Sequence, residues 1–97
     1  MKLRFTPQAI QDLAVIGDYL REHNPAATER VRAAILDALQ NLLVFPRAGR
    51  RQTVDGVRKL MTRKYRYLIY YTAGMAAEEI IILSIRHPSR EREHSDT

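Results

Sequence analysis

The sequence predicts an α+β fold in which an antiparallel helical hairpin packs against a mainly antiparallel sheet. Two stretches with helical apolar periodicity follow one another closely, and the pattern then changes to that of strands. The chain has 97 residues, enough for one domain with a modest core, and no linker or repeat divides them. We therefore expect a single domain over residues 1–97, with a flexible tail at 91–97.

The first expected elements are a short strand and a helix. Residues 2–5 alternate polar and apolar side chains, which predicts a strand. Thr6 is a good N-cap, and Pro7 at the first helical position lacks an N–H group that would be unpaired there anyway. The apolar stripe of this helix then recurs at helical spacing, at Ala9, Leu13, Ile16 and Leu20.

A second helix follows after only a few residues, so the two helices form an antiparallel hairpin. Asn24 is expected to cap it and Pro25 to begin it. It ends at Phe45, because Pro46 disfavours helical backbone in the residue before it. Its apolar stripe consists of Val31, Ile35, Ala38 or Leu39, and Leu42.

Three strands are expected in the remainder of the chain. Residues 47–51 have the composition of a loop, and strands are predicted at 57–62, 65–72 and 80–85, with a turn at 63–64. These three strands form the antiparallel sheet on which the hairpin packs.

The strand at 80–85 is apolar on both faces, as a central strand is. Ile81 and Leu83 lie on one face, opposite Ile80, Ile82 and Ser84 on the other. Since the helices cover only one face of the sheet, we expect a partner chain to cover the second.

Several classes of chemistry are excluded by composition. With no cysteine, disulfides, thiol catalysis and thiolate metal sites are impossible. No His or Glu recurs at a metal-binding spacing and no glycine-rich phosphate loop is present, so we predict no metal and no cofactor. No apolar run approaches the ~20 residues of a membrane helix, and the N-terminus lacks the apolar region of a secretory signal. These features predict a cytoplasmic protein.

The positive charge is concentrated in one segment. The formal net charge is +5, but residues 47–66 hold eight basic residues and Asp55 as the only acid. Such a segment attracts a phosphate backbone or an acidic protein surface, or is a solvated face that aids solubility. The charge therefore predicts where a surface lies without identifying its partner.

Five sequence stretches, in order along the chain, carry a resemblance to a known family. They are Phe5-Thr6-Pro7, Phe45-Pro46-Arg47-Ala48-Gly49-Arg50, Gly56-Val57-Arg58-Lys59-Leu60, Tyr65-Arg66-Tyr67-Leu68-Ile69-Tyr70-Tyr71, and Ile82-Leu83-Ser84-Ile85-Arg86-His87 before Arg90. Over residues 2–90 the chain resembles the ParE/RelE superfamily of toxins from type II toxin–antitoxin systems, often labelled plasmid-stabilisation proteins. The long hairpin and the His87-x-x-Arg90 ending are more similar to the ParE branch.

The resemblance to the ParE branch implies a toxin that inhibits DNA gyrase and is neutralised by a cognate antitoxin. A gyrase inhibitor needs a charged surface and no catalytic group. The expected target contacts are Arg58, Arg66, Arg86 and Arg90. The antitoxin is expected to dock an apolar peptide on the hairpin and the open sheet, with contacts at Leu13, Ile16, Leu20, Tyr67 and Tyr71.

The resemblance to the RelE branch implies the alternative, a ribosome-dependent mRNA endoribonuclease. Attack of a ribose 2′-OH on its phosphate needs a base, an acid and cations for the developing charge. The residues in matching places are Lys59, Arg66, His87 and His94. The terminal tyrosine of RelE-type toxins is absent, and His94 lies at about its place. The third interpretation is a non-toxic family member that only binds a partner.

Two features have structural as well as functional interpretations. His87 can act as an acid or base near neutrality, or can simply close the last strand with a hydrogen bond. The tyrosines between Tyr65 and Tyr71 can stack on bases beside Arg66, or can pack in the sheet with their hydroxyl groups at its rim.

Overall fold

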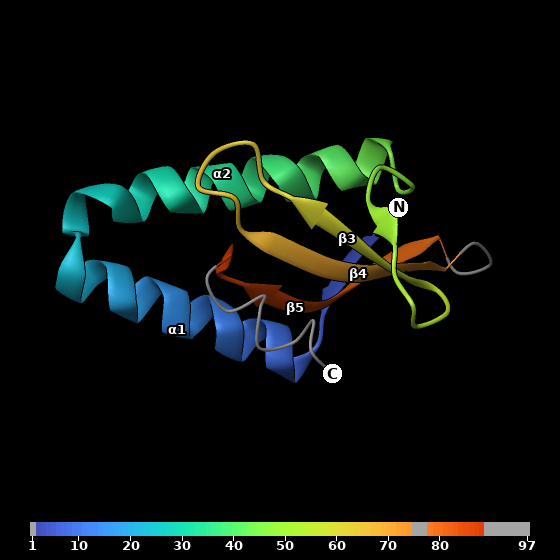
Figure 1. The fold of residues 1–97 in the computed structure, drawn as a ribbon, viewed down its shortest axis with the longest axis horizontal. Helices are drawn as coiled ribbons and strands as arrows, with labels where there is room; N and C mark the ends of the chain where they lie inside the picture. The colour runs from blue at the N-terminus through green and yellow to red at the C-terminus, as the bar shows by residue number, and fades with distance from the viewer. Residues whose placement is uncertain (1, 75–77, 89–97) are drawn as a thin grey trace.

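The computed structural model describes residues 2–74 and 78–88 of the chain (Figure 1). Arg90 and His94, and the tail expected to be flexible, lie outside the described residues. The elements in chain order are β1 (Lys2–Phe5), α1 (Pro7–His23), α2 (Pro25–Val44), β2 (Arg50–Arg51), β3 (Val57–Met61), β4 (Leu68–Gly74) and β5 (Glu79–Arg86). Within the described residues, no helix is both long enough and apolar enough to span a membrane.

Both helices begin where the sequence predicts, but only one has the predicted cap. The Thr6 hydroxyl accepts a hydrogen bond from the Ala9 N–H at 3.1 Å, which satisfies one of the unpaired donors at the start of α1. The prediction that the Asn24 side chain caps α2 is wrong, because it makes no capping hydrogen bond. Instead the Asn24 N–H donates to the Leu20 carbonyl, and its own carbonyl accepts from the Ala27 N–H. The backbone of this single residue therefore joins the two helices.

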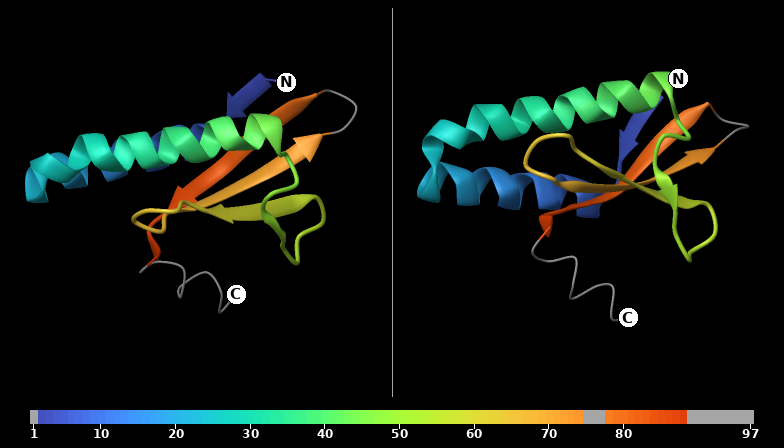
Figure 2. Two further views of the ribbon diagram at one scale, coloured as in Figure 1. Left: turned by 90° about the horizontal axis from the view of Figure 1, so that it is seen from above. Right: turned by 45° about the horizontal axis from the view of Figure 1, so that its top comes forward.

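The α+β architecture is confirmed, with a sheet of five strands in the order β1-β5-β4-β3-β2. It is wider than the predicted three strands because β1 joins it in parallel beside β5, and β2 forms where a loop was expected. The other strand pairs are antiparallel. The hairpin packs on one face of this sheet, and its turn extends beyond the strands (Figures 1 and 2).

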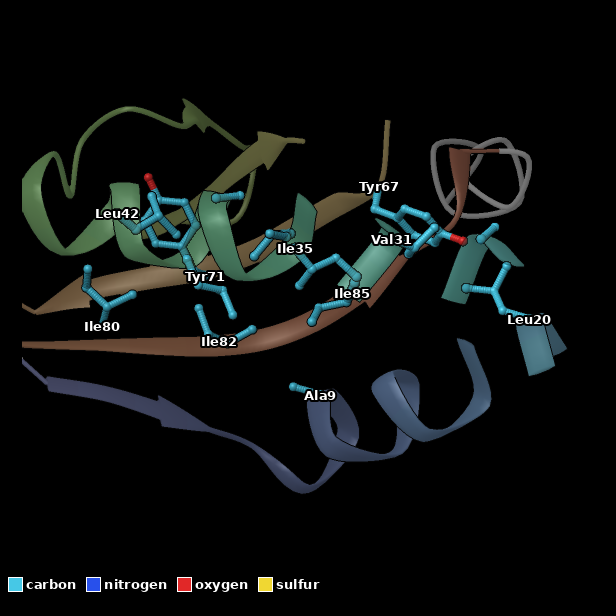
Figure 3. Close-up of a cluster of buried hydrophobic side chains, with 14 residues drawn as sticks. Ala9, Leu20, Val31, Ile35, Leu42, Tyr67, Tyr71, Ile80, Ile82 and Ile85 are labelled. Atoms are coloured by element: carbon cyan, nitrogen blue, oxygen red, sulfur yellow. The ribbon is translucent and has the colours of Figure 1, made fainter. Parts of the chain in front are cut away.

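The hydrophobic core lies between the helices and the sheet face that carries Tyr71, Ile80 and Ile82, all three fully buried (Figure 3). Leu42 of α2 is also fully buried. Full burial of an aliphatic side chain stabilises a fold by about 1.5–3 kcal/mol. The opposite face of the sheet is not covered by the helices and is called the open face below.

A β-bulge in the middle of the sheet changes which residues face the core. The register between β4 and β5 shifts at Tyr70/Tyr71, so that Tyr71 pairs with Ile82 but Tyr70 pairs with Ser84. The prediction that Ser84 shares a face with Ile82 is therefore wrong: Ser84 lies with Tyr70 on the open face. Ile85 moves into the core in its place.

Beyond the end of β1, side chains at the start of α1 form hydrogen bonds with the backbone of β5 along the same edge. The pairing with β1 ends at Ile82, and beyond it the Thr6 hydroxyl donates to the Leu83 carbonyl at 2.8 Å. The Asp12 carboxylate then accepts from the Ile85 N–H at 3.0 Å. Backbone groups that would otherwise lack a strand partner are thus satisfied.

Candidate functional site

The open face carries two of the residues predicted from the sequence. Lys59 pairs with Tyr70 and Arg86 pairs with Leu68, and since Tyr70 and Leu68 are two residues apart, both basic side chains lie on the open face. The Lys59 Nζ lies 6.0 Å from the centre of the Tyr70 ring, within reach of a cation–π interaction. Arg50 lies opposite Lys59 and extends this row to the edge of the sheet.

Arg58 lies on the other face. It pairs with Tyr71 and therefore points to the helix side, although it was expected to contact the target. Its guanidinium donates to the Gly49 carbonyl at 2.8 Å and to the Arg47 carbonyl at 3.4 Å. Arg58 therefore holds the loop before β2, a role that the sequence alone does not reveal.

The Tyr71 hydroxyl forms hydrogen bonds with the same loop from the core side. It donates to the Pro46 carbonyl at 2.8 Å and accepts from the Gly49 N–H at 2.9 Å. Burial raises the pKa of Tyr71, and the Gly49 N–H and the nearby Arg58 charge offset part of that rise. Position 49 has no room for a side chain, since an added Cβ would lie 2.7 Å from the Tyr71 hydroxyl and 2.9 Å from the Lys59 carbonyl.

Arg66 lies in a turn, not on a strand as predicted. Residues Tyr65 and Arg66 have φ angles of 68° and 53°, and β4 begins only at Leu68. The buried Thr62 closes the turn: its hydroxyl donates to the Lys64 carbonyl at 2.6 Å and accepts from the Tyr67 N–H at 3.0 Å. These contacts need a four-residue loop, so a two-residue turn at 63–64 does not form.

His87 lies away from the open face. It directly follows Arg86, and its ring packs edge-on against Tyr67, with the centroids 5.3 Å apart. Tyr67 belongs to the core, so His87 lies on the helix side of the sheet. The described residues proposed for RNA cleavage are therefore not brought together: Lys59 is on the open face, Arg66 in a turn and His87 on the helix side.

A groove of about 360 Å³ runs between α1 and the end of β5. Val15, Tyr19, Tyr67 and His87 are among the residues that line it. Burial raises the pKa of Tyr67, and the neighbouring Tyr19 raises it further. The exposed Val15 and Tyr19 give the groove apolar surface, which suits an apolar segment of another protein.

The residues predicted to bind an antitoxin divide into two groups. Leu20, Tyr67 and Tyr71 are 9%, 5% and 0% exposed and belong to the chain's own core. Leu13 and Ile16 are half-buried on α1. The sequence interpretation missed the exposed apolar side chains of the same helix, which deviate from the simple inward stripe: Ile10, Val15 and Tyr19.

The basic segment forms one edge of the sheet, from β2 through β3 to the β3–β4 turn. Along this edge, the exposed cations that have no ion pair in the described part of the chain are Arg50, Arg51, Arg63, Lys64 and Arg66. Elsewhere in the described residues, ion pairs join Arg4 to Glu79, Arg21 to Asp18 and Arg32 to Glu29. The basic edge therefore keeps its charge available to a partner.

Comparison with known proteins gives one consistent family. The sequence profile of the ParE toxin of parDE type II toxin–antitoxin systems matches residues 3–92. Two relatives are each 30% identical to the chain. A Sinorhizobium fredii protein named as a candidate toxin, Y4kP, aligns over 90 residues (93% of this chain and 91% of the relative). Toxin RelE2 of Caulobacter vibrioides aligns over 86 residues (89% of this chain and 93% of the relative).

A solved structure is also similar. It is a chain of the chromosomal ParDE system of P. aeruginosa, with a TM-score of 0.73 and 28% sequence identity, and the match covers 90% of this chain and 95% of that chain.

Proposed function

Because the chain belongs to the ParE toxin family of type II toxin–antitoxin systems, we propose that it inhibits DNA gyrase and that a cognate antitoxin neutralises it. One observation carries the choice of target. Neither of the two described histidines lies on the open face beside Lys59 and Arg86: His23 is on α1 and His87 packs on Tyr67. General acid–base cleavage needs a proton donor and acceptor within hydrogen-bond reach of the reacting phosphate. A gyrase inhibitor needs only a shaped, charged surface, which the basic edge supplies.

Arg66 and Arg86 remain proposed target contacts, and both differ from Arg58, whose guanidinium is engaged by the loop before β2. Arg66 is exposed in its turn and Arg86 is half-buried on the open face. Lys59 adds positive charge to the same face as Arg86 from β3, which β4 separates from β5. The similarity to a ParDE chain at 28% identity supports this assignment.

The proposed antitoxin contact is the α1–β5 groove together with the exposed face of α1. Val15 and Tyr19 offer apolar surface there, and Ile16 also lines the groove. Co-expression with the neighbouring open reading frame is expected to yield a complex. The double variant Val15→Ser/Tyr19→Ser is expected to weaken it, whereas Arg30→Gln, an exposed change on α2, leaves it intact.

The second candidate function is ribosome-dependent mRNA cleavage. It is favoured by the 30% identity to toxin RelE2 and by the placement of Lys59, Tyr70 and Arg86 on one face. In this case the phosphate binds on the open face, and the proton-transfer groups come from elsewhere. A family member without toxicity is the third possibility, and it predicts unchanged growth when the chain is expressed alone.

Expression of the chain without an antitoxin, followed by pulse-labelling of DNA and protein synthesis, separates these functions. Under the gyrase proposal DNA synthesis falls first, and the purified chain blocks gyrase-catalysed supercoiling of a relaxed plasmid. A collapse of protein synthesis before DNA synthesis, with cut mRNA and undisturbed supercoiling, would contradict it.

A further inference from the structure

We infer that the β2–β3 ribbon, in which Arg50 and Arg51 pair with Lys59 and Arg58, contacts the phosphate backbone of duplex DNA through its two exposed arginines, Arg50 and Arg51. This inference rests on the proposed function, because the DNA in question is the duplex on which gyrase acts. It extends that function by assigning a nucleic-acid contact to the chain itself, at Arg50 and Arg51, which the sequence predicted to lie in a loop.

The first observation is the register of the ribbon. Arg50 lies directly opposite Lys59 and Arg51 directly opposite Arg58, so both pairs of this strand place like charges side by side. Like charges directly opposite across an antiparallel pair destabilise it. With only two residues in β2, few ladder hydrogen bonds oppose that repulsion. The ribbon therefore holds positive charges close together, although their repulsion destabilises the pairing of its two strands.

The second observation is the set of polar contacts that hold the ribbon in place. The side-chain amide of Gln52 donates to the carbonyls of Arg50 and Arg51 at 3.0 and 3.1 Å. The backbone N–H of Gln52 donates to the Val57 carbonyl. Arg58 and Tyr71 fasten the preceding loop. The backbone positions of Arg50 and Arg51 are thus held by the fold before any partner binds.

The third observation is that the ribbon's exposed charges are not neutralised within the described residues. Arg50 and Arg51 are exposed and form no ion pair there. Asp55 and Glu78 line the same hollow as Arg51 and Arg58, yet neither carboxylate pairs with either arginine. Both exposed cations are arginines, whose planar guanidinium groups bind phosphate oxygens in a bidentate manner.

The chemistry of the ribbon favours duplex DNA over the other polyanions. Single-stranded nucleic acid binds by stacking bases on exposed aromatic rings. The ring beside the ribbon, that of Tyr70, is half-buried and lies beneath Lys59. The centre of a protein–protein interface has apolar anchors, whereas Arg50 and Arg51 are followed by Gln52 and Thr53. Contacts to a regular backbone need neither feature.

Fluorescence anisotropy with a fluorescein-labelled DNA duplex of mixed sequence, at a series of NaCl concentrations, tests the inference. The ribbon variant is Arg50→Gln/Arg51→Gln, and the matched control is Arg30→Gln/Arg32→Gln, which removes the same charge from exposed positions of α2. Each phosphate contact contributes about −0.9 to the slope of log K against log salt. We expect the ribbon variant to lose affinity and its slope to become shallower by about 1.8 for two contacts. The control should keep most of the wild-type slope.

Three results would overturn the inference: equal losses in both double variants, tighter binding of the single-stranded RNA of the same sequence, or equal displacement of the duplex by polyglutamate and by unlabelled DNA. The variant Arg50→Lys/Arg51→Lys keeps the charge and is expected to retain the salt slope. Circular dichroism melts of each variant verify that the chain is folded.

A gyrase supercoiling assay with the same variants separates this inference from the proposed function. We expect the ribbon variant to require a higher concentration than the control for equal inhibition. If the wild type and the ribbon variant inhibit equally, the ribbon inference is wrong and the gyrase proposal stands. If the wild type does not inhibit at all, the gyrase proposal is wrong, and the DNA titration still decides the ribbon contact.

Discussion

The two sides of the sheet are held by different forces. The side formed by β5, the adjoining β4 and the helices is stabilised by apolar burial, with Ile80, Ile82 and Leu42 fully enclosed. The side formed by β2 and β3 is held by a few polar contacts centred on Gly49, Tyr71 and Arg58. The first side contributes stability distributed over many contacts. The second side carries the basic residues of β2 and β3, and its geometry depends on single hydrogen bonds.

Because the two sides are held differently, substitutions in them are expected to have different effects. A change in the apolar side is expected to lower the free energy of unfolding of the whole chain. A change in the polar side acts on the position of the ribbon, and its effect on stability is smaller.

The largest expected effect is that of Ile82→Ala. Removing this fully buried side chain beneath the hairpin leaves a cavity and lowers the free energy of unfolding by about 2–5 kcal/mol. Urea denaturation measures the change. Ile81→Ala, at the half-buried neighbour on the open face, is the control and should have a distinctly smaller effect. Equal losses would mean that the open face is as well packed as the core.

Gly49→Ala is expected to come next, with a loss of about 1–3 kcal/mol from overpacking. The new Cβ would meet the Tyr71 ring and hydroxyl and the Lys59 backbone, which cannot all move away. Gly74→Ala is the matched control, because nothing lies within 4 Å of its added Cβ. Thermal melts of both variants should therefore differ clearly, and similar melts would show that the loop before β2 adapts easily.

Tyr71→Phe removes only a hydroxyl, but it leaves the Gly49 N–H and the Pro46 carbonyl without their partner. An unsatisfied buried polar group lowers stability by about 1–3 kcal/mol, and relaxation of the loop places this variant near the lower end. Tyr19→Phe at an exposed site is the control and should be near neutral. The duplex affinity of the Tyr71→Phe chain should fall as well, since the loop positions β2.

The same tyrosine predicts a dependence of stability on alkaline pH. The pKa of Tyr71 is raised above its ordinary value of 10.0, so the folded chain retains this proton where the unfolded chain loses it. The resulting stability is complete below pH 10 and is lost as the pH rises from there towards the folded pKa. Urea midpoints from pH 9 upwards should fall less steeply in Tyr71→Phe than in the wild type. Parallel curves would contradict the assignment.

The smallest effect is expected from the ribbon variant Arg50→Gln/Arg51→Gln, and its sign is opposite. Relief of two like-charge pairs should raise the free energy of unfolding by about 0.2–1 kcal/mol for each pair. The gain should shrink at high salt, where exposed charges are screened. Thermal melts at low and high salt measure it. A loss of stability at low salt would show that the repulsion is already relieved by the fold.

Much of the fold could be predicted because its signals are local. The Thr6-Pro7 start of α1 and the apolar stripes of the hairpin follow from capping and periodicity, which a sequence displays directly. β2 could not be predicted, since two residues show no alternation. The bulge that exchanges Ser84 for Ile85 depends on the register with β4, which only the assembled sheet defines.

The candidate site was harder to predict than the fold, for a similar reason. The sequence locates the basic segment correctly, and Lys59 and Arg86 do share the open face. The role of Arg58 depends on which face of β3 meets the helices, and the position of Arg66 depends on the buried Thr62 hydroxyl. Both are long-range or side-chain effects that periodicity does not encode.

The central position of β5 has a consequence for synthesis of the chain. β5 is the last described strand to be translated, yet it lies between β1 and β4, and the Thr6 hydroxyl reaches a carbonyl 77 residues away. The hairpin and the β3–β4 pair rest on local contacts and can form early. The nascent chain lacks a continuous open face until β5 leaves the ribosome. The fold is therefore completed only after β5 has been translated, and a partner that recognises the assembled sheet can bind only from that point.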